Sequence, residues 1–381
     1  MNALLIAFLG VAGLLWIGSF GFLGLLMVIT RLRRRAAPRP DSWPDVALVV
    51  PTLNEEAYIL EKLDDLRRVD YPSDKYRILV VDGGSTDRTC DLVRERIRDG
   101  EAARLTCMSG VRNKVEQVIR SLELVSEEFI VFTDADVRLE PDCVRELVSL
   151  LLADRRVAIV GATVRPVSRL LEEIIHWKLH NFLWWLEGEA FSAAGFSGVC
   201  YALRRDSATR IDRDIQAEDI HLSLSVCAGG HRVRLCPSAV ANELRVPQTV
   251  REFYRFRRRR GTRYVAALKH FQHPGRRSWG WQIVRRARLW QFSIAPWLGV
   301  LLAGLGLALL MTPQRSYLLI IPAAFVAPLL GGILVLNRDS GRISGWGKLL
   351  FASLRYSVLI MTSLLILGHG PSAHDGPGGP P

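Results

Sequence analysis

Short apolar runs alternate with amphipathic stretches between residues 45 and 250, and this pattern predicts strands and helices in alternation. Such an order favours a mainly parallel sheet covered by helices. The strands are expected at residues 46–50, 77–81, 104–108, 129–133 and 157–162. The helices are expected at residues 55–67, 85–98, 113–124 and from 141 onward. Pro51 is predicted to end the first strand, and Ser85 or Thr86 to cap the second helix.

The two ends of the chain are far more apolar than its middle. Residues 1–30 carry no charged side chain, and about 20 apolar residues are enough to cross a bilayer. We expect a transmembrane anchor at residues 3–30 rather than a cleaved signal peptide, because a basic start and a small-residue cleavage site are both missing. Three further spans are predicted at residues 289–312, 316–337 and 349–368. Arg355, near the start of the last span, is expected to reach back to the membrane interface; the alternative is that it faces the protein interior as part of a polar pathway.

Basic residues follow the first predicted span and precede the second. Because basic loops are retained in the cytosol, residues 31–288 are predicted to be cytosolic, with both termini outside a bacterial cytoplasmic membrane. The expected organisation is an N-terminal anchor, a catalytic domain, a basic interfacial segment, a group of three spans and a disordered tail. These five parts cover residues 1–30, 31–250, 251–288, 289–368 and 369–381.

The formal net charge of +12 is concentrated in one part of the chain, since residues 251–288 carry an equal excess of basic side chains. A basic segment that runs into a membrane span is typical of contact with anionic lipid headgroups or diphosphates. Nucleic acid is not an expected partner, because the recognisable nucleic-acid modules are absent from the sequence. The six cysteines show no paired metal spacing and are expected to be reduced and buried.

Polar residues follow three of the predicted strands. In open α/β sheets, ligands bind beyond the carboxyl ends of the strands, so these residues are candidates for one site. They are Thr52, Asn54 and Glu55 after the first strand, Asp82, Ser85 and Asp87 after the second, and Asp134 and Asp136 after the fourth. Asp87 can equally serve as an ordinary helix cap.

Asp134 and Asp136 flank a single small residue directly after an apolar strand. Hard carboxylate oxygens of this kind suit Mg²⁺ or Mn²⁺, with substrate phosphates completing the coordination shell. The alternative for so short a motif is a turn or a helix cap. Glycine-rich fingerprints of dinucleotide cofactors and P-loops are absent from the sequence.

Glu218 and Asp219 stand at the start of a predicted helix, about 80 residues after the aspartate pair. A carboxylate there can act as a general base that takes a proton from an acceptor hydroxyl. Favourable interaction of negative charge with the helix dipole explains the same residues equally well.

Four ordered motifs together resemble glycosyltransferase family 2 over about residues 45–262. They are VVPTLNEE at 49–56, VVDGGSTD at 80–87, FTDAD at 132–136, and Glu218-Asp219. The resemblance implies a GT-A fold and inverting transfer from a nucleotide sugar, commonly a UDP-sugar. It implies that the donor is bound by Pro51, Thr52, Glu55 and Asp82, that Asp134 and Asp136 hold the metal and diphosphate, and that Asp219 is the base. Gly83 stands where the family often has a second aspartate.

Three weaker motifs extend this resemblance. The run Arg112-Asn113-Lys114-Val115 is similar to the ceramide glucosyltransferase branch, which implies a diphosphate contact for Lys114; a solvated lysine is the alternative. The run GVCYALRR at 198–205 resembles the acceptor-side strand, where Gly198 permits close approach of the substrate. The run FRRRR at 256–260 departs from the QxxRW-type motif of processive synthases, although Arg257 and Arg259 can still bind the diphosphate.

Residues 170–191 form an amphipathic stretch that is rich in tryptophan. Such helices lie in membrane interfaces, so Trp184 and Trp185 are expected to guide a lipid acceptor to the site. Packing within the domain is the alternative. His176 and His180 have helical metal spacing but lack the glutamate and third ligand of a zinc site.

The sequence therefore predicts a membrane-anchored, Mg²⁺- or Mn²⁺-dependent enzyme that transfers a sugar from a nucleotide-sugar donor to a lipid or lipid-linked acceptor at the cytosolic membrane face. A processive polysaccharide synthase is the nearest alternative. A non-catalytic membrane scaffold that keeps the fold is an alternative of another class.

Overall fold

The computed structural model describes residues 3–33, 42–98, 105–109, 114–207, 218–271, 279–312 and 352–358. The predicted span at 316–337, most of the one at 349–368 and the tail at 369–381 lie outside the described residues. Arg112 and Asn113 of the lysine motif also lie outside them.

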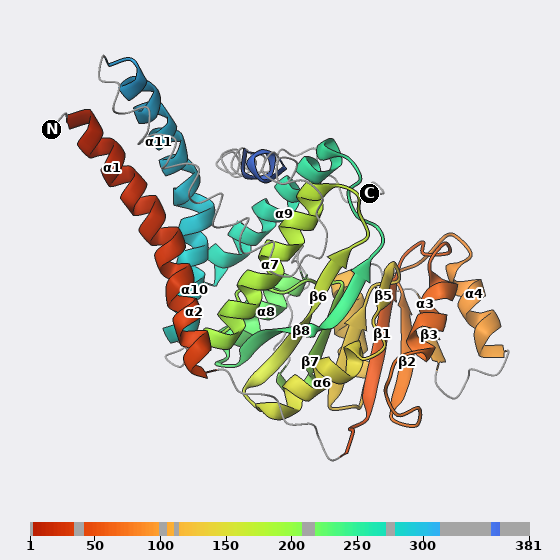
Figure 1. Ribbon diagram of the computed structural model, residues 1–381. Coiled ribbons are helices and arrows are strands. Elements are labelled where there is room, and N and C mark those ends of the chain that lie inside the picture. Colours follow the sequence, from red (N-terminus) through yellow and green to blue (C-terminus); the bar gives the residue numbers. More distant parts are fainter. Residues whose placement is uncertain are drawn as a thin grey trace.

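Eight strands form one mixed sheet in the order β3-β2-β1-β4-β7-β6-β8-β5 (Figure 1). Their bounds are Val46–Thr52 (β1), Tyr76–Asp82 (β2), Leu105–Met108 (β3), Phe129–Thr133 (β4), Val137–Leu139 (β5), Val157–Pro166 (β6), Cys200–Arg204 (β7) and Arg232–Glu243 (β8). The four strands β3, β2, β1 and β4 are parallel, as the alternation of elements predicts. β7 is antiparallel to both β4 and β6, and β5 is antiparallel to β8, so the rest of the sheet is mixed.

The first strand does not end at Pro51, contrary to the prediction from sequence. Pairing of β1 with β4 stops at Val49, but pairing with β2 continues through Pro51 to Thr52 and Asp82. Proline is tolerated because one side of this part of the strand carries no ladder partner. Thr52 and Asp82 thus end two neighbouring parallel strands side by side.

In the described part of the central region, seven α-helices follow or connect these strands. Their bounds are Ile59–Arg67 (α3), Thr89–Arg96 (α4), Lys114–Leu124 (α5), Cys143–Ala153 (α6), Leu171–Ala190 (α7), Glu218–Ala228 (α8) and Val250–His270 (α9). The predicted cap at Ser85 or Thr86 is wrong, because α4 begins at Thr89. The N-cap is Arg88, and Asp87 before it accepts a hydrogen bond from the Thr89 amide at 3.0 Å.

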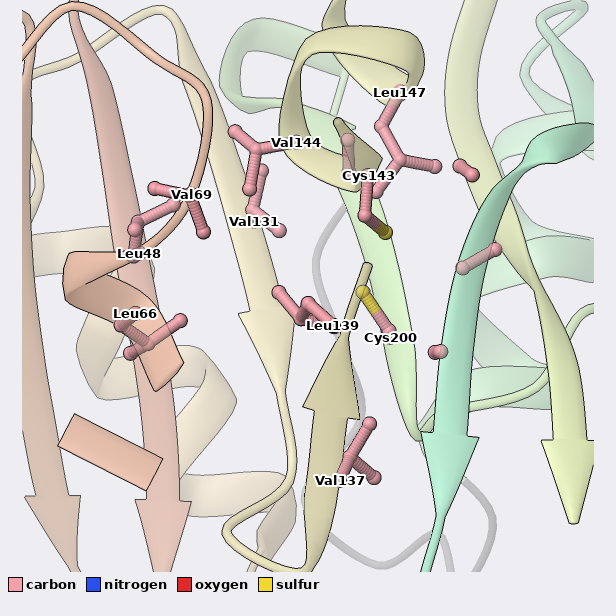
Figure 2. Close-up of a cluster of buried hydrophobic side chains, with 14 of the residues drawn as sticks. Leu48, Leu66, Val69, Val131, Val137, Leu139, Cys143, Val144, Leu147 and Cys200 are labelled. Atoms are coloured by element: carbon pink, nitrogen blue, oxygen red, sulfur yellow. The ribbon is translucent and has the colours of Figure 1, made fainter. Parts of the chain in front are cut away.

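Alternate residues of the central strands belong to two hydrophobic clusters, one on each face of the sheet. Leu48 belongs to the cluster covered by α3 and α6, whereas Val49 belongs to the one covered by α5 and α8. Figure 2 shows Leu66 of α3 and Val144 of α6 in the first cluster, together with Leu48 of β1 and Val131 of β4. All six cysteines are free; Cys90 and Cys107 are half-buried, and the other four are buried.

Two long apolar helices extend away from the sheet and pack side by side (Figure 1). One runs through α1 (Ala3–Trp16), a π-helical turn η1 (Ile17–Gly21) and α2 (Phe22–Arg33), and the other through α10 (Trp279–Leu289), η4 (Trp290–Ile294) and α11 (Ala295–Leu310). Both are long and apolar enough to cross a membrane, by length and composition. They correspond to the first two predicted spans, and the second helix begins ten residues earlier than expected.

Helix α7 connects the long helices to the sheet. It packs against β8, β6, α2 and α9, and the Glu187 carboxylate pairs with the Arg288 guanidinium at 2.6 Å. Arg355, which was expected to reach the membrane interface, pairs with the buried Glu172 of α7. Much of α7 thus packs within the domain, which was the alternative to a position in the membrane interface.

Candidate active site

Two loops at the carboxyl ends of β1 and β2 are joined by short polar side chains. Asn54 has a positive φ of 57°, a conformation that asparagine tolerates better than most residues. Its side-chain oxygen accepts a hydrogen bond from the Thr86 amide at 2.9 Å. The Glu55 amide donates to the Thr89 hydroxyl at 2.8 Å. These contacts set the position from which the Glu55 side chain enters the site.

Asp82, a predicted nucleoside contact, is only 1 % exposed and organises the second of these loops. Its carboxylate accepts hydrogen bonds from the Gly84 and Ser85 amides at 2.8 and 2.9 Å, and from the Thr52 hydroxyl at 3.4 Å. Burial by itself raises the pKa of Asp82, but the hydrogen bonds from Ser85 and Gly84 outweigh it, so the pKa lies below its ordinary value. The charged form of Asp82 is therefore favoured, and its carboxylate ties together the Gly84 and Ser85 amides of the loop.

Asp134 and Asp136 occupy the tight connection between β4 and β5. The Asp134 amide donates to the Val199 carbonyl at 3.0 Å, and the Leu244 amide donates to the Asp136 carbonyl at 2.9 Å. Burial, followed by the negative charge of Asp134, raises the pKa of Asp136. Both aspartates also act electrostatically on Glu55, so three carboxylates from two loops share one region.

Helix α5 contributes a lysine and a glutamine one turn apart. Lys114 Nζ contacts both carboxylate oxygens of Asp134, at 2.7 and 3.0 Å. Gln117, which the sequence analysis did not single out, is buried and donates to the Thr52 and Val81 carbonyls at 2.7 and 2.8 Å. Lys114 is thus engaged at the aspartate pair and is not a detached surface lysine.

Arg245 is a second residue that sequence reasoning missed, because the strand before it was not predicted. It forms a bidentate pair with Glu55, and its Nε lies 3.4 Å from Asp136. Its guanidinium also lies over the Tyr58 ring, at 5.0 Å from the centroid. Arg245 therefore ties the loop after β1 to the loop after β4.

Asp219 lies at the same edge of the sheet, against the residues that lead into β7. Its carboxylate accepts hydrogen bonds from the Gly198 amide at 3.1 Å and the Ile220 amide at 2.8 Å. The neighbouring Val199 holds Asp134. Consecutive residues thus connect the candidate base to the candidate metal pair, and Gly198 gives close approach to Asp219. Glu218 is the first residue of α8.

The two arginines predicted to bind the diphosphate differ in their surroundings. Arg257 is buried, pairs with Glu173 of α7 and lies among aromatic rings that include Trp177. Arg259 is exposed and lies 5.8 Å from the centroid of the Phe256 ring. Their contacts with a diphosphate remain a prediction.

The two tryptophans predicted to meet the acceptor point in different directions from α7. Trp184 packs against both core clusters and forms an edge contact with Trp177 at 6.4 Å between centroids. Trp185 packs in the cluster that joins α7 to α2 and α10. Their role toward an acceptor likewise remains a prediction.

The residues at this edge fit a divalent cation that a ligand helps to hold. Among the residues that the structure describes, no group of three or more histidine, cysteine or acidic side chains forms a complete metal site. Asp134 and Asp136 supply two carboxylates from one tight connection, and burial, followed by the negative charge of Asp134, raises the pKa of Asp136. Mg²⁺ and similar ions are commonly bound by one or two carboxylates together with substrate phosphates.

The chain belongs to the glycosyltransferases of family 2. The family described as "Glycosyl transferase family group 2" matches residues 129–336, more than half of the chain, and "Glycosyl transferase family 2" matches residues 47–208. The matched ranges contain each of the four motifs that carried the resemblance. The curled α/β sheet is accordingly GT-A-like.

Individual relatives and one solved structure agree with this assignment. The mannosyltransferase PcManGT from Pyrobaculum calidifontis, solved in complex with GDP-Man and Mn²⁺, is 26% identical with a TM-score of 0.66, and the match covers 92% of this chain and 97% of that one. The "Probable glycosyltransferase YdaM" of Bacillus subtilis is 28% identical over 236 residues, which is 58% of this chain and 56% of that protein. A Methanococcus voltae glucuronosyltransferase, whose name gives a dolichyl N-acetylglucosaminyl phosphate acceptor, is 22% identical over 211 residues, 52% of this chain and 66% of that protein. The chain thus spans between half and two thirds of the length of these two curated relatives.

Proposed function

We propose that this protein transfers a sugar from a nucleotide-sugar donor, with UDP as the expected nucleotide, to a lipid or lipid-linked acceptor at the cytosolic face of a membrane. The transfer is inverting and depends on Mg²⁺ or Mn²⁺. One observation carries the proposal: Asp134 and Asp219 are held by the consecutive residues Val199 and Gly198, at the edge where β1, β2 and β4 end.

The donor would lie across the carboxyl ends of β1, β2 and β4. Pro51, Thr52, Glu55 and Asp82 shape the nucleoside end, and Asp82 acts mainly by keeping its loop rigid. Lys114 and the exposed Arg259 offer positive charge to the diphosphate, and Asp134 and Asp136 would hold the cation. When bound, such a cation stabilises the negative charge that develops on the leaving diphosphate.

Asp219 would take the proton from the attacking acceptor hydroxyl. The Gly198 and Ile220 amides hold its carboxylate in one orientation, so the base does not have to be ordered during the reaction. Attack from the side opposite the leaving diphosphate gives inversion at the sugar carbon. The acceptor would reach this face beside α7, where the two long apolar helices meet the domain.

A lipid acceptor is supported by two features of different kinds. The long helices are apolar enough to enter a bilayer, and the name of the dolichyl-linked transferase gives a lipid-linked acceptor. A Nostoc β-monoglucosyldiacylglycerol synthase, 27% identical over 140 residues that are 35% of this chain and 29% of that protein, has a lipid product by its name. The basic excess in residues 251–288 favours an anionic membrane surface over nucleic acid.

The test is the variant Asp219→Asn in the purified full chain, incubated with labelled nucleotide sugar, Mn²⁺ and lipid extract. Transfer is expected to fall by at least about 100-fold, because general-base catalysis contributes that much, while donor binding is retained. Wild-type-like transfer by the variant would remove Asp219 from the role of base. The same assay reports product length: a single addition is expected, and a ladder of products would favour the processive alternative. Failure of the wild type to transfer or hydrolyse any nucleotide sugar would favour the scaffold.

A further inference from the structure

Arg245 divides its guanidinium unequally between two carboxylates of the candidate site. Two of its nitrogens bind Glu55 in a bidentate pair, which is the strong arrangement for arginine and a carboxylate. Its Nε lies 3.4 Å from Asp136, longer than an ordinary charged hydrogen bond. Glu55 is therefore the firm partner of Arg245, and Asp136 is the loose one.

The contact between Arg245 and Asp136 places a positive charge beside a carboxylate that has little access to solvent. The side chains of Glu55 and Asp136 are only 12 % and 15 % exposed, whereas that of Arg245 is 34 % exposed. Asp136 also lies within electrostatic range of the negatively charged Asp134. Asp134 is itself paired with Lys114. Each aspartate of the pair thus lies beside one basic side chain from another element.

We infer that Arg245 is a positioning residue that competes with a divalent cation for Asp136, while Glu55 keeps its guanidinium at the site. This inference rests on the proposed function, because it takes Asp136 as a ligand of the cation. A cation at Asp136 displaces the Arg245 Nε–H, which becomes available to an anionic diphosphate beside it. Cation and nucleoside diphosphate therefore bind cooperatively, and Arg245 carries part of that coupling.

The test measures Mn²⁺ binding by the full chain through the electron paramagnetic resonance signal of free Mn²⁺, with Mn²⁺ alone and then with UDP or GDP. Without nucleotide, Arg245→Gln is expected to bind Mn²⁺ about three-fold more tightly than the wild type, the size expected for loss of one half-exposed ion pair. The gain in Mn²⁺ affinity that nucleotide produces is expected to be smaller in the variant. Arg245→Lys keeps the charge and should stay close to the wild type.

Arg145 offers a matched control at the opposite edge of the sheet. Its side chain is 35 % exposed, pairs with Asp70 at 2.6 Å and lies 5.1 Å from the centroid of the Trp43 ring. Arg145→Gln therefore removes a comparable arginine and should leave Mn²⁺ affinity unchanged. A merely structural role of Arg245 predicts the opposite sign, weaker Mn²⁺ binding in Arg245→Gln.

The outcomes separate this inference from the proposed function. Unchanged or weaker Mn²⁺ binding by Arg245→Gln, with normal nucleotide-enhanced binding by the wild type, overturns the inference and leaves the proposed metal site intact. Absence of Mn²⁺ binding by the wild type, with and without nucleotide, overturns both. If Arg245→Gln does not fold, Arg245→Met replaces it as the variant without the charge: tighter Mn²⁺ binding than the wild type supports the inference, and unchanged or weaker binding overturns it.

Discussion

Gly198 controls how closely the chain can approach Asp219. A Cβ at position 198 would lie 3.0 Å from Asp219 Oδ2 and 3.2 Å from Asp219 Cβ, closer than side chains normally pack. Gly198→Ala should therefore push the carboxylate aside and lower transfer by about 10- to 100-fold, since small misplacements of a catalytic group have effects of that size. Donor affinity should change by less than about two-fold, because the proposed role of Asp219 is toward the acceptor hydroxyl.

The measurement for Gly198→Ala is the transfer rate together with nucleotide-diphosphate affinity. Gly24→Ala is the matched control, because a Cβ at that position has open space around it. Normal transfer by Gly198→Ala would show that the position of the Asp219 carboxylate does not limit the reaction.

Glu243, the last residue of β8, links protonation to stability. Burial, with the nearby charges of Glu173 and Asp136, raises its pKa to about 7 despite the opposing effect of Arg260 and Arg257. A carboxyl group with a raised folded-state pKa stabilises the fold fully only below its unfolded pKa, and this contribution is lost as the pH rises through about 7. Stability conferred by Glu243 should thus decline between about pH 4.5 and pH 7.

The variant Glu243→Gln should remove this dependence, because the amide does not ionise. The wild type loses this contribution as the pH rises and the variant does not. The variant's free energy of unfolding minus that of the wild type should therefore increase by on the order of 2–3 kcal/mol between pH 4.5 and pH 8, at about 1.4 kcal/mol per unit of pKa shift. Melting temperatures of both proteins across this range provide the measurement. Parallel pH profiles would refute the assignment to Glu243.

At the scale of elements, the pair Glu173–Arg257 fixes α7 against α9. Both side chains are almost fully buried, so removal of one partner leaves an uncompensated charge. Glu173→Gln should destabilise the protein by on the order of 3 kcal/mol. The double variant Glu173→Leu with Arg257→Met should recover most of this loss, because apolar groups can replace a buried pair.

Melting temperature measures the stability of these variants, and Arg165→Gln, which breaks an exposed pair with Glu140, is the control. The double variant also tests the diphosphate contact of Arg257 separately from folding. Loss of nucleotide affinity in a stable double variant assigns Arg257 to the donor, and retained affinity assigns it to packing. No recovery of stability in the double variant would contradict the role of the pair.

The elements differ in how far their sequence predicts them. β4 lies at the predicted residues, and β1 and β2 extend one or two residues beyond theirs, because continuous apolar runs are typical of central parallel strands. β8 was missed, since its pattern is interrupted near Pro237 and its register with β6 shifts between Ala162 and Thr163. Arg245 follows β8 and was missed with it.

At the scale of the whole molecule, the domain and the long helices form a continuous contact. Leu26 of α2, Leu186 of α7 and Val284 of α10 share one buried cluster. The buried Glu187–Arg288 pair lies between the same elements. The face of the domain that carries α7 is therefore tied to the two long apolar helices.

Ligand binding should stabilise the whole molecule, because a ligand that binds only the folded state raises its melting temperature. UDP or a UDP-sugar together with Mn²⁺ should raise it more than either component alone. A ligand concentration of about 100 times the dissociation constant corresponds to an increase of about 2.7 kcal/mol in the free energy of unfolding. A thermal-shift screen of nucleotide diphosphates with and without Mn²⁺ provides the measurement. Identical shifts with and without the cation would contradict the proposed metal dependence.

The sequence by itself determined the family, the central strands and the acidic groups at their ends, because these depend on local patterns of side chains. Only the tertiary structure decided which charges meet. Arg245 reaches Glu55 and Asp136, and Gly198 reaches Asp219, through contacts between residues far apart in the chain. Such contacts depend on the order and direction of strands in the sheet, and no local pattern encodes either of them.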